Sequence, residues 1–104
     1  MRVYLDDERK TPDGWERTYS VRETIDLLAS GLVTHLSLDH DLGHIDPLTG
    51  KESTGYDVLL WIEEQTTLDP MFMPPHMQVH SDNASAVPKM LQAIRQIEKI
   101  FSRR

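Results

Sequence analysis

Acidic side chains follow two short apolar runs in this sequence, at the positions where buried strands would end. Asp6 and Asp7 directly follow the first run, and Asp39 and Asp41 follow the second. Several carboxylates gathered in a partly buried site repel one another, and a bound hard cation relieves that repulsion. Carboxylate oxygens suit Mg²⁺ or Mn²⁺, so these four residues are predicted to form a divalent-metal site. The alternative for each of them is an ordinary helix cap or strand end in solvent.

Two histidines stand at the ends of predicted central strands, where they can face one cleft. His40 lies within the second acidic cluster, and His80 ends a later apolar run. Imidazoles titrate near neutral pH, so such a pair suits proton transfer during phosphodiester cleavage, one as base and one as acid. A structural role is the equally open alternative. His40 and His44 also have a spacing seen among zinc ligands, but they lack a full ligand set.

Five further residues are candidates for binding phosphate. They are Arg9, Thr54, Gly55, Ser81 and Asn83. The Ser81 hydroxyl can donate to a phosphate oxygen. Thr54 and Gly55 open a predicted helix, whose backbone N–H groups and dipole favour an anion, although the same pair also suits a plain N-cap. Arg9 can contact phosphate or form a surface ion pair with a neighbouring acid.

The elements that must position these residues are predicted by apolar runs, each followed by helical periodicity. Residues 3–5, 36–38 and 77–80 are expected strands of a mostly parallel sheet, and residues 15–19 are an expected edge strand. Residues 44–53 are expected to form a long loop. In a parallel sheet the loops at the carboxyl ends converge, so the acids and histidines should meet at one edge.

Three helices are expected to cover this sheet. A capping box at Ser20 starts the first helix, whose apolar stripe extends to Leu32, and Thr54 starts the second. The third helix follows the polar residues 81–85, and Pro88 is tolerable only in its first turn. Its buried stripe is predicted to contain Met90, Leu91, Ile94, Ile97 and Phe101.

Composition limits the possible classes of protein. The chain has 104 residues, a net charge of −6, 38% hydrophobic residues and no cysteine. These values predict one domain, residues 1–104, in a reducing cytoplasm, and they exclude disulfides and thiolate chemistry. No run approaches the roughly 20 apolar residues of a membrane span. The acidic balance disfavours duplex nucleic acid as a partner, and the sequence leaves the oligomeric state open.

Five motifs occur in a characteristic order along nearly the whole chain. They are Leu5-Asp6-Asp7-Glu8-Arg9, Pro12 with Trp15, Ser37-Leu38-Asp39-His40-Asp41-Leu42-Gly43, Thr54-Gly55-Tyr56-Asp57 and His80-Ser81-Asp82-Asn83. Together they resemble the cyclic-phosphate-processing receiver-like domain family, a divergent relative of response-regulator receiver domains. The resemblance implies a small three-layer α/β fold of the receiver (flavodoxin-like) kind, with a short, mostly parallel sheet of about four strands.

The resemblance also implies roles for the site residues. Asp6 and Asp7 correspond to the acidic metal pair of a receiver and Asp39 to the phosphoacceptor position, with histidines added to that site. The implied activity is the processing of cyclic phosphates on nucleotides or RNA ends. Asp82 is a departure, because a small residue is more usual there. The fifth-strand lysine of phosphorelay receivers has no counterpart, so two-component signalling is the weaker interpretation.

The leading hypothesis is a metal-assisted phosphoesterase that acts on the cyclic phosphate of a nucleotide or an RNA end. The four aspartates hold Mg²⁺ or Mn²⁺ in this hypothesis, and Asp39, His40 and His80 form its catalytic group. The alternative from another functional class is a non-catalytic receiver-like module that uses the same acidic edge to recognise a nucleotide or a protein partner.

Overall fold

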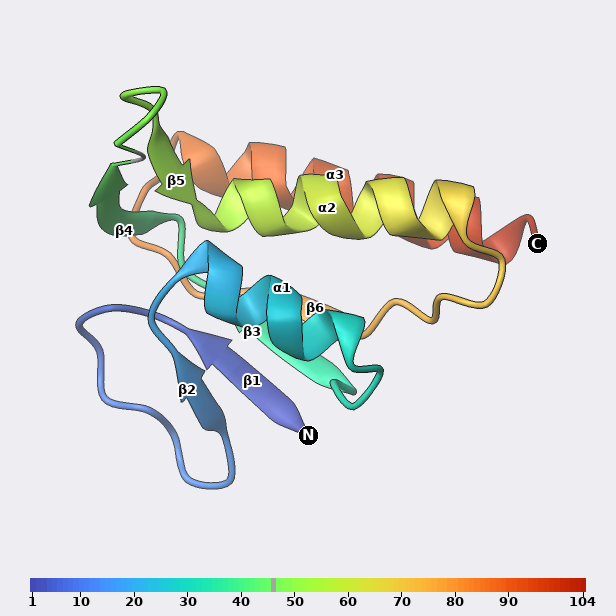
Figure 1. Ribbon diagram of the computed structural model, residues 1–104, viewed down its shortest axis with the longest axis horizontal. Helices are drawn as coiled ribbons and strands as arrows, with labels where there is room; N and C mark the ends of the chain where they lie inside the picture. The colour runs from blue at the N-terminus through green and yellow to red at the C-terminus, as the bar shows by residue number, and fades with distance from the viewer. Residues whose placement is uncertain (46) are drawn as a thin grey trace.

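The centre of the fold is a sheet of four parallel strands (Figure 1). The computed structural model describes residues 1–45 and 47–104, and the side chain of His44 also lies outside this description. In spatial order the strands are β2 (Glu16–Thr18), β1 (Arg2–Leu5), β3 (His35–Leu38) and β6 (His76–Val79). With β1 between β2 and β3, this is the strand order of flavodoxin-like folds. The predicted α/β class and the four-strand parallel sheet are confirmed.

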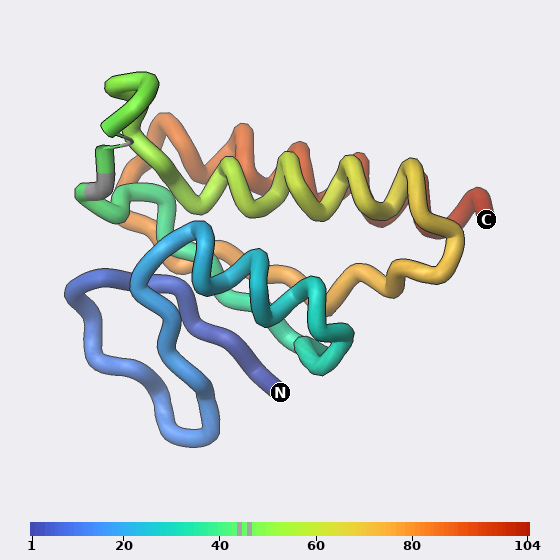
Figure 2. The backbone as a smooth tube through the Cα atoms, viewed as in Figure 1, coloured from blue at the N-terminus to red at the C-terminus, as the bar shows by residue number. Residues whose placement is uncertain are grey.

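Three helices pack together on one side of the sheet (Figures 1 and 2). They are α1 (Val21–Ala29), α2 (Gly55–Leu68) and α3 (Ala86–Ser102). The connections from β2 to β3 and from β3 to β6 advance in the same direction across the sheet. Right-handed crossovers therefore place α1 and α2 on the same face, and α3 packs against α2. No helix in the described part of the chain is long and apolar enough to cross a membrane.

Alternating side chains give the sheet two different faces. Val3, Leu5, Leu36 and Leu38 point toward the helices and are fully buried in the core. The residues between them, such as Tyr4, point to the opposite face. The hydrophobic core therefore lies between the sheet and the helices.

The expected layering differs in one respect from the structure. Three layers require helices on both faces, whereas the described helices cover only one. The connection between β1 and β2, residues 6–15, contains no helix. It is an irregular segment at the edge of the uncovered face, and its Trp15 ring makes an edge contact with Tyr4. The opposite face of the sheet is consequently left without a helical layer.

The two ends of the expected loop at residues 44–53 belong to the strands of a two-stranded antiparallel hairpin. Its strands are β4 (Asp41–Ile45) and β5 (Glu52–Thr54). Leu42 is fully buried and anchors β4 to the core. Figure 1 shows the hairpin beside the N-terminal ends of α2 and α3. The hairpin therefore stands over the carboxyl edge of the sheet.

The predicted helix starts are confirmed, but two residues of the predicted apolar stripes, Leu32 and Leu91, are exposed. The Ser20 hydroxyl accepts a hydrogen bond from Glu23 N at 3.1 Å and caps α1. Pro88 lies in the first turn of α3, where its missing N–H costs least. Leu32 is 62% exposed because α1 ends at Ala29, before the apolar stripe reaches it.

Candidate metal and phosphate site

Three carboxylates meet at the carboxyl edge of the sheet. Asp6 and Asp7 follow β1, and Asp39 follows β3. One oxygen from each of the three lies within 4.8 Å of the other two. The backbone brings them together, because Asp39 N donates to Leu5 O at 3.0 Å and holds the ends of the two strands level. This spacing allows all three carboxylates to contact one small cation.

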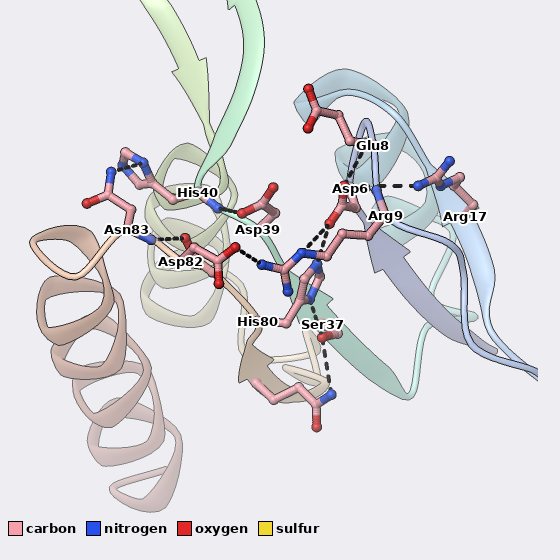
Figure 3. A network of polar contacts seen from close by, with 12 residues as sticks. Asp6, Glu8, Arg9, Arg17, Ser37, Asp39, His40, His80, Asp82 and Asn83 are labelled. Carbon is pink, nitrogen blue, oxygen red and sulfur yellow. Dashed lines mark hydrogen bonds and ion pairs between the residues drawn. The ribbon is translucent and has the colours of Figure 1, made fainter.

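Asp6 is fully buried and is held by the turn that follows it. Its Oδ1 accepts hydrogen bonds from Glu8 N at 2.7 Å and Arg9 N at 2.8 Å (Figure 3). Burial alone would raise the pKa of Asp6, but these N–H groups and His80 together lower it below its usual range. Asp6 is therefore a fixed anion at neutral pH.

Asp39 is in the opposite situation. Burial and the nearby charge of Asp6 raise the pKa of Asp39, although the hydrogen bond from His40 N at 2.8 Å acts in the other direction. An ionised Asp39 thus carries an electrostatic cost in the absence of a cation. The three oxygens are hard ligands, so the residues present fit Mg²⁺ or Mn²⁺ better than a softer metal.

His80 connects the acidic cluster to the middle of the sheet. Its Nε2 lies 3.1 Å from Asp6 Oδ2, and its Nδ1 lies 2.6 Å from Ser37 Oγ (Figure 3). Gln78 Nε2 donates to the same Ser37 oxygen at 3.1 Å. The Ser37 proton is then left to donate to Nδ1, so the neutral ring carries its proton on Nε2 and donates it to Asp6.

The surroundings of His80 also keep its ring neutral. Burial lowers the pKa of His80, and the charge of Asp6 only partly offsets this effect. The ring stacks on Tyr4 with centroids 4.0 Å apart and planes inclined by 5°. Both nitrogens and one ring face of His80 are therefore in contact with protein groups.

His40 belongs to a separate polar group. Its Nδ1 lies 2.8 Å from Asp41 Oδ1, and Asn83 Nδ2 lies 3.3 Å from both oxygens of Asp41. The hydrogen bond from His40 holds the pKa of Asp41 below its usual range. Figure 3 shows the His40 ring turned toward Asn83 and away from the Asp39 carboxylate. The two histidines thus do not meet in one cluster.

A cavity of about 380 Å³ lies over the carboxylates. Its lining includes the three clustered aspartates, Asp41, Arg9 and Asp82. Arg9 Nη2 lies 2.6 Å from Asp82 Oδ2, and Arg9 Nε lies 3.8 Å from Asp6 Oδ2 (Figure 3). The cavity thus combines carboxylates that could hold a cation with one guanidinium, and both a bound cation and a guanidinium can contact phosphate oxygens.

Comparison with known proteins agrees with this geometry. The family model of the cyclic-phosphate processing receiver domain matches residues 1–96. The chain belongs to this family. No curated protein and no solved structure gives a significant match. The description of the family links it to cyclic-phosphate processing, and the resemblance found in the sequence motifs is confirmed.

The structure places the predicted site residues of this receiver domain in different surroundings. Asp6, Asp7 and Asp39 form the carboxylate cluster, whereas Asp41 lies outside that cluster and contacts His40 and Asn83. Arg9 lines the cavity, and its role as a phosphate contact stays a prediction. The zinc alternative falls on the His44 side chain, which lies outside the described part of the chain.

The remaining predicted phosphate contacts have structural roles. Thr54 N donates to Asp57 Oδ2 at 2.9 Å, and Gly55 N donates to His40 O at 3.1 Å. The Ser81 hydroxyl accepts from Asn83 N at 3.1 Å, and Asn83 Oδ1 accepts from Ala86 N at 3.0 Å at the start of α3. These contacts fit the alternative of plain capping, which the sequence left open.

Three residues of the site were missed in the sequence. Ser37 and Gln78 lock the ring of His80, and Tyr4 stacks on it. The signal available was their register, since Tyr4 pairs with Ser37 and Ser37 pairs with Gln78 across neighbouring strands. A serine between two leucines of a buried strand indicates a polar partner on the other face.

Proposed function

We propose that this receiver domain is a metal-assisted phosphoesterase that opens cyclic phosphates on nucleotides or RNA ends. The observation that carries the proposal is the meeting of Asp6, Asp7 and Asp39 within 4.8 Å, beneath a cavity that Arg9 also lines. These three residues would hold Mg²⁺ or Mn²⁺. Such an ion, when bound, supplies positive charge that stabilises the developing charge on phosphate oxygens.

The reaction is a hydrolysis at phosphorus. A water oxygen forms a new bond to the phosphorus atom, one of the two ester P–O bonds of the ring breaks, and the departing sugar oxygen takes up a proton. The product is a linear phosphomonoester. Arg9 would hold a non-bridging oxygen of the phosphate, because a guanidinium presents N–H donors in a geometry that suits phosphate.

The two histidines take different parts in this proposal. With Nδ1–H donating to Asp41, His40 keeps the lone pair of Nε2 for accepting a proton, which is the arrangement of an oriented general base. His80 positions Asp6, since both of its nitrogens already have protein partners. His40 is therefore the residue that we propose for proton transfer, and His80 is a positioning residue.

A turnover assay tests the proposal. The purified protein is incubated with a 2′,3′-cyclic mononucleotide and Mg²⁺ or Mn²⁺, and the phosphomonoester is followed by ³¹P NMR. We expect metal-dependent conversion, a large loss of rate in Asp7→Asn, and little change in the exposed control Asp13→Asn. A linear phosphomonoester is run in parallel to measure specificity for the ring.

Two outcomes would count against the proposal. Binding of the cyclic mononucleotide without turnover under any of these metals would support the non-catalytic recognition module instead. Equal hydrolysis of the linear phosphomonoester would keep the site but remove its specificity for cyclic phosphates.

A further inference from the structure

We propose that the helix-free face of the sheet binds single-stranded RNA and leads its end to the acidic cavity. The proposal rests on the proposed function and extends it from a cyclic phosphate to the strand that carries one. We call this surface the open face. It consists of Arg2, Tyr4, Trp15, Arg17, His35, Ser37, His76 and Gln78.

The register of the strands defines the open face. One row across β1, β3 and β6 contains Arg2, His35 and His76, which are directly paired. The next row on the same face contains Tyr4, with Arg17 on one side and Ser37 and then Gln78 on the other. The first row is exposed, and the helices of the described chain all lie behind the sheet. In the second row Tyr4 is 8% exposed and Ser37 is fully buried, so the first row and Gln78 are the part of the open face that is most available to a partner.

The charge of the open face is opposite to that of the protein. The chain as a whole carries a net charge of −6, whereas none of the eight residues of the open face is acidic. Two are arginines and two are histidines. Glu16, the acid of β2, pairs with Val3 and therefore shares its register row on the helix side. This separation of charge favours an anionic partner on the open face.

Aromatic side chains make the open face suitable for bases as well as phosphates. Trp15 is half-buried, and the Arg2 guanidinium lies 5.6 Å from its ring centroid. The His35 and His76 rings lie 5.6 Å apart. Flat rings interleaved with cations are the usual surface for single-stranded nucleic acid, because bases stack on the rings while phosphates pair with the cations. An acidic protein segment would use the cations but not the rings.

The open face is continuous with the catalytic edge. Tyr4 makes an edge contact with Trp15 on one side and stacks on His80 on the other. His80 in turn contacts Asp6 in the floor of the cavity. A strand lying on the open face would therefore lie beside the side chains that connect this face to Asp6 in the floor of the cavity. A cyclic mononucleotide is too short to use it.

Arg17 supplies an independent indication of a missing partner. Its Nε and Nη2 are buried without a hydrogen-bond partner in the described part of the chain, and Asp6 Oδ1 lies 4.0 Å from Nη2. Buried polar groups normally have hydrogen-bond partners, so these two nitrogens indicate a contact with a ligand or solvent in addition to the contacts of Arg17 with Asp6 and the Tyr19 ring. Arg17 pairs with Tyr4 and so belongs to the second row of the open face.

Fluorescence anisotropy with labelled RNA tests the inference. The probes are a six-nucleotide single strand with a 2′,3′-cyclic phosphate end, the same strand with a 3′-hydroxyl, and its duplex. Competition with a 2′,3′-cyclic mononucleotide gives the affinity of the end alone. We expect the cyclic-ended strand to bind about tenfold or more tightly than the mononucleotide, because stacking and phosphate contacts add to the end. The duplex should bind more weakly than the strand.

Charge reversal on the open face should remove this preference. Arg2→Glu and His76→Glu, on different strands, are each expected to weaken strand binding about tenfold and to reduce its salt dependence. Arg95→Glu is the matched control, because Arg95 is an exposed arginine on α3 in the helical layer. It should change the affinity by less than about twofold. Circular dichroism of each variant confirms that the fold is retained.

The outcomes separate this inference from the proposed function. Turnover of the mononucleotide with no preference for the strand would overturn the inference alone. Strand binding that depends on the open face, without turnover, would overturn the proposed function alone. The protein could instead form a dimer that binds no RNA and that dissociates in Arg2→Glu and His76→Glu. This outcome would assign the open face to a second copy of the chain and overturn the inference.

Discussion

His80 Nε2 lies 3.1 Å from Asp6 Oδ2, so an imidazole at the end of β6 holds the carboxylate at the end of β1. The ring is in turn held by Ser37 at its other nitrogen. Loss of a partner that orients a metal-binding group in this way typically lowers metal affinity or activity by about 10- to 100-fold. The position of Asp6 therefore depends on residues from three strands.

Substitution of the two histidines should have different kinetic consequences. We expect His80→Ala to raise the Mg²⁺ concentration needed for half-maximal activity by about 10- to 100-fold, because Asp6 loses its orienting donor. His80→Gln should restore part of the affinity through its amide N–H. His40→Ala should instead lower kcat by about a hundredfold or more at saturating metal, because it removes a proton-transfer group. Steady-state rates measured over a range of Mg²⁺ concentrations distinguish the effect on metal affinity from the effect on kcat.

The opposite pattern would change the assignment. If His80→Ala leaves the metal dependence unchanged and lowers kcat at saturating metal, His80 transfers protons as the sequence analysis predicted. A loss of only about twofold in His40→Ala would remove His40 from the proton transfer.

Much of the site was predictable because strand ends are marked in the sequence. Apolar runs that stop at Asp6 and Asp39 locate the carboxyl ends of two parallel strands, and parallel strands bring those ends to one edge. The carboxylate cluster follows from that rule without side-chain detail. The neighbours of each histidine do not, because they depend on which way a ring turns after the strand ends.

The uncovered face and the hairpin were less predictable for physical reasons. Residues 6–15 end in a turn with Pro12 and Gly14, so the sequence shows that no helix is favoured there, but not that the face stays open. The hairpin strand β4 contains one fully buried residue, Leu42, among polar neighbours. A single apolar anchor is too weak a pattern to separate a short strand from a loop.

Neutralisation of Asp39 should stabilise the protein in the absence of metal. The folded pKa of this carboxyl is raised by burial and by the charge of Asp6, so ionised Asp39 destabilises the fold at neutral pH. We expect Asp39→Asn to raise Tm by a few degrees in a chelator, at about 4–8 °C for each kcal/mol. The amide oxygen can still accept from His40 N. The Tm difference should shrink as pH falls through the folded pKa, because the wild-type carboxyl then becomes neutral.

The same variant should lose its response to metal. Millimolar Mg²⁺ or Mn²⁺ should raise the wild-type Tm by mass action and leave Asp39→Asn nearly unchanged. Differential scanning calorimetry with and without the ion measures both effects. If neither ion changes the wild-type Tm, the metal site is contradicted. If Asp39→Asn has a lower Tm than the wild type in chelator, the proposed repulsion between Asp39 and Asp6 is contradicted.

Gly55 should be essential for the position of Asp39. A Cβ at residue 55 would lie 1.8 Å from Asp39 O, so Gly55→Ala must push the start of α2 away from the end of β3. We expect destabilisation of about 1–3 kcal/mol together with weaker metal binding. Gly31→Ala is the control for destabilisation alone. The positive φ of Gly31, 78°, strains an alanine, but no atom lies within 4 Å of the added Cβ. If both variants retain the same metal affinity in a calorimetric titration, the contact with Asp39 does not position the site.

Asp82 should compete with phosphate for Arg9. Arg9 Nη2 lies 2.6 Å from Asp82 Oδ2, and the Asp82 side chain is 96% exposed beside the cavity. A phosphate that binds Arg9 must break this ion pair, which is weak because water screens an exposed pair of charges. We therefore expect Asp82→Ala to tighten the binding of inorganic phosphate by up to about fivefold in the presence of Mg²⁺. Isothermal titration calorimetry measures this change.

A double-mutant cycle separates competition from a general change in charge. Removal of any acid near the cavity favours an anion, so Asp82→Ala is also measured in an Arg9→Ala background. Competition predicts that the gain disappears there, because phosphate no longer needs the guanidinium that Asp82 occupied. Asp26→Ala is the matched control, since Asp26 is an exposed acid that pairs with Arg22 at 3.4 Å on α1. An equal gain with and without Arg9 would show that Asp82 acts only through its charge.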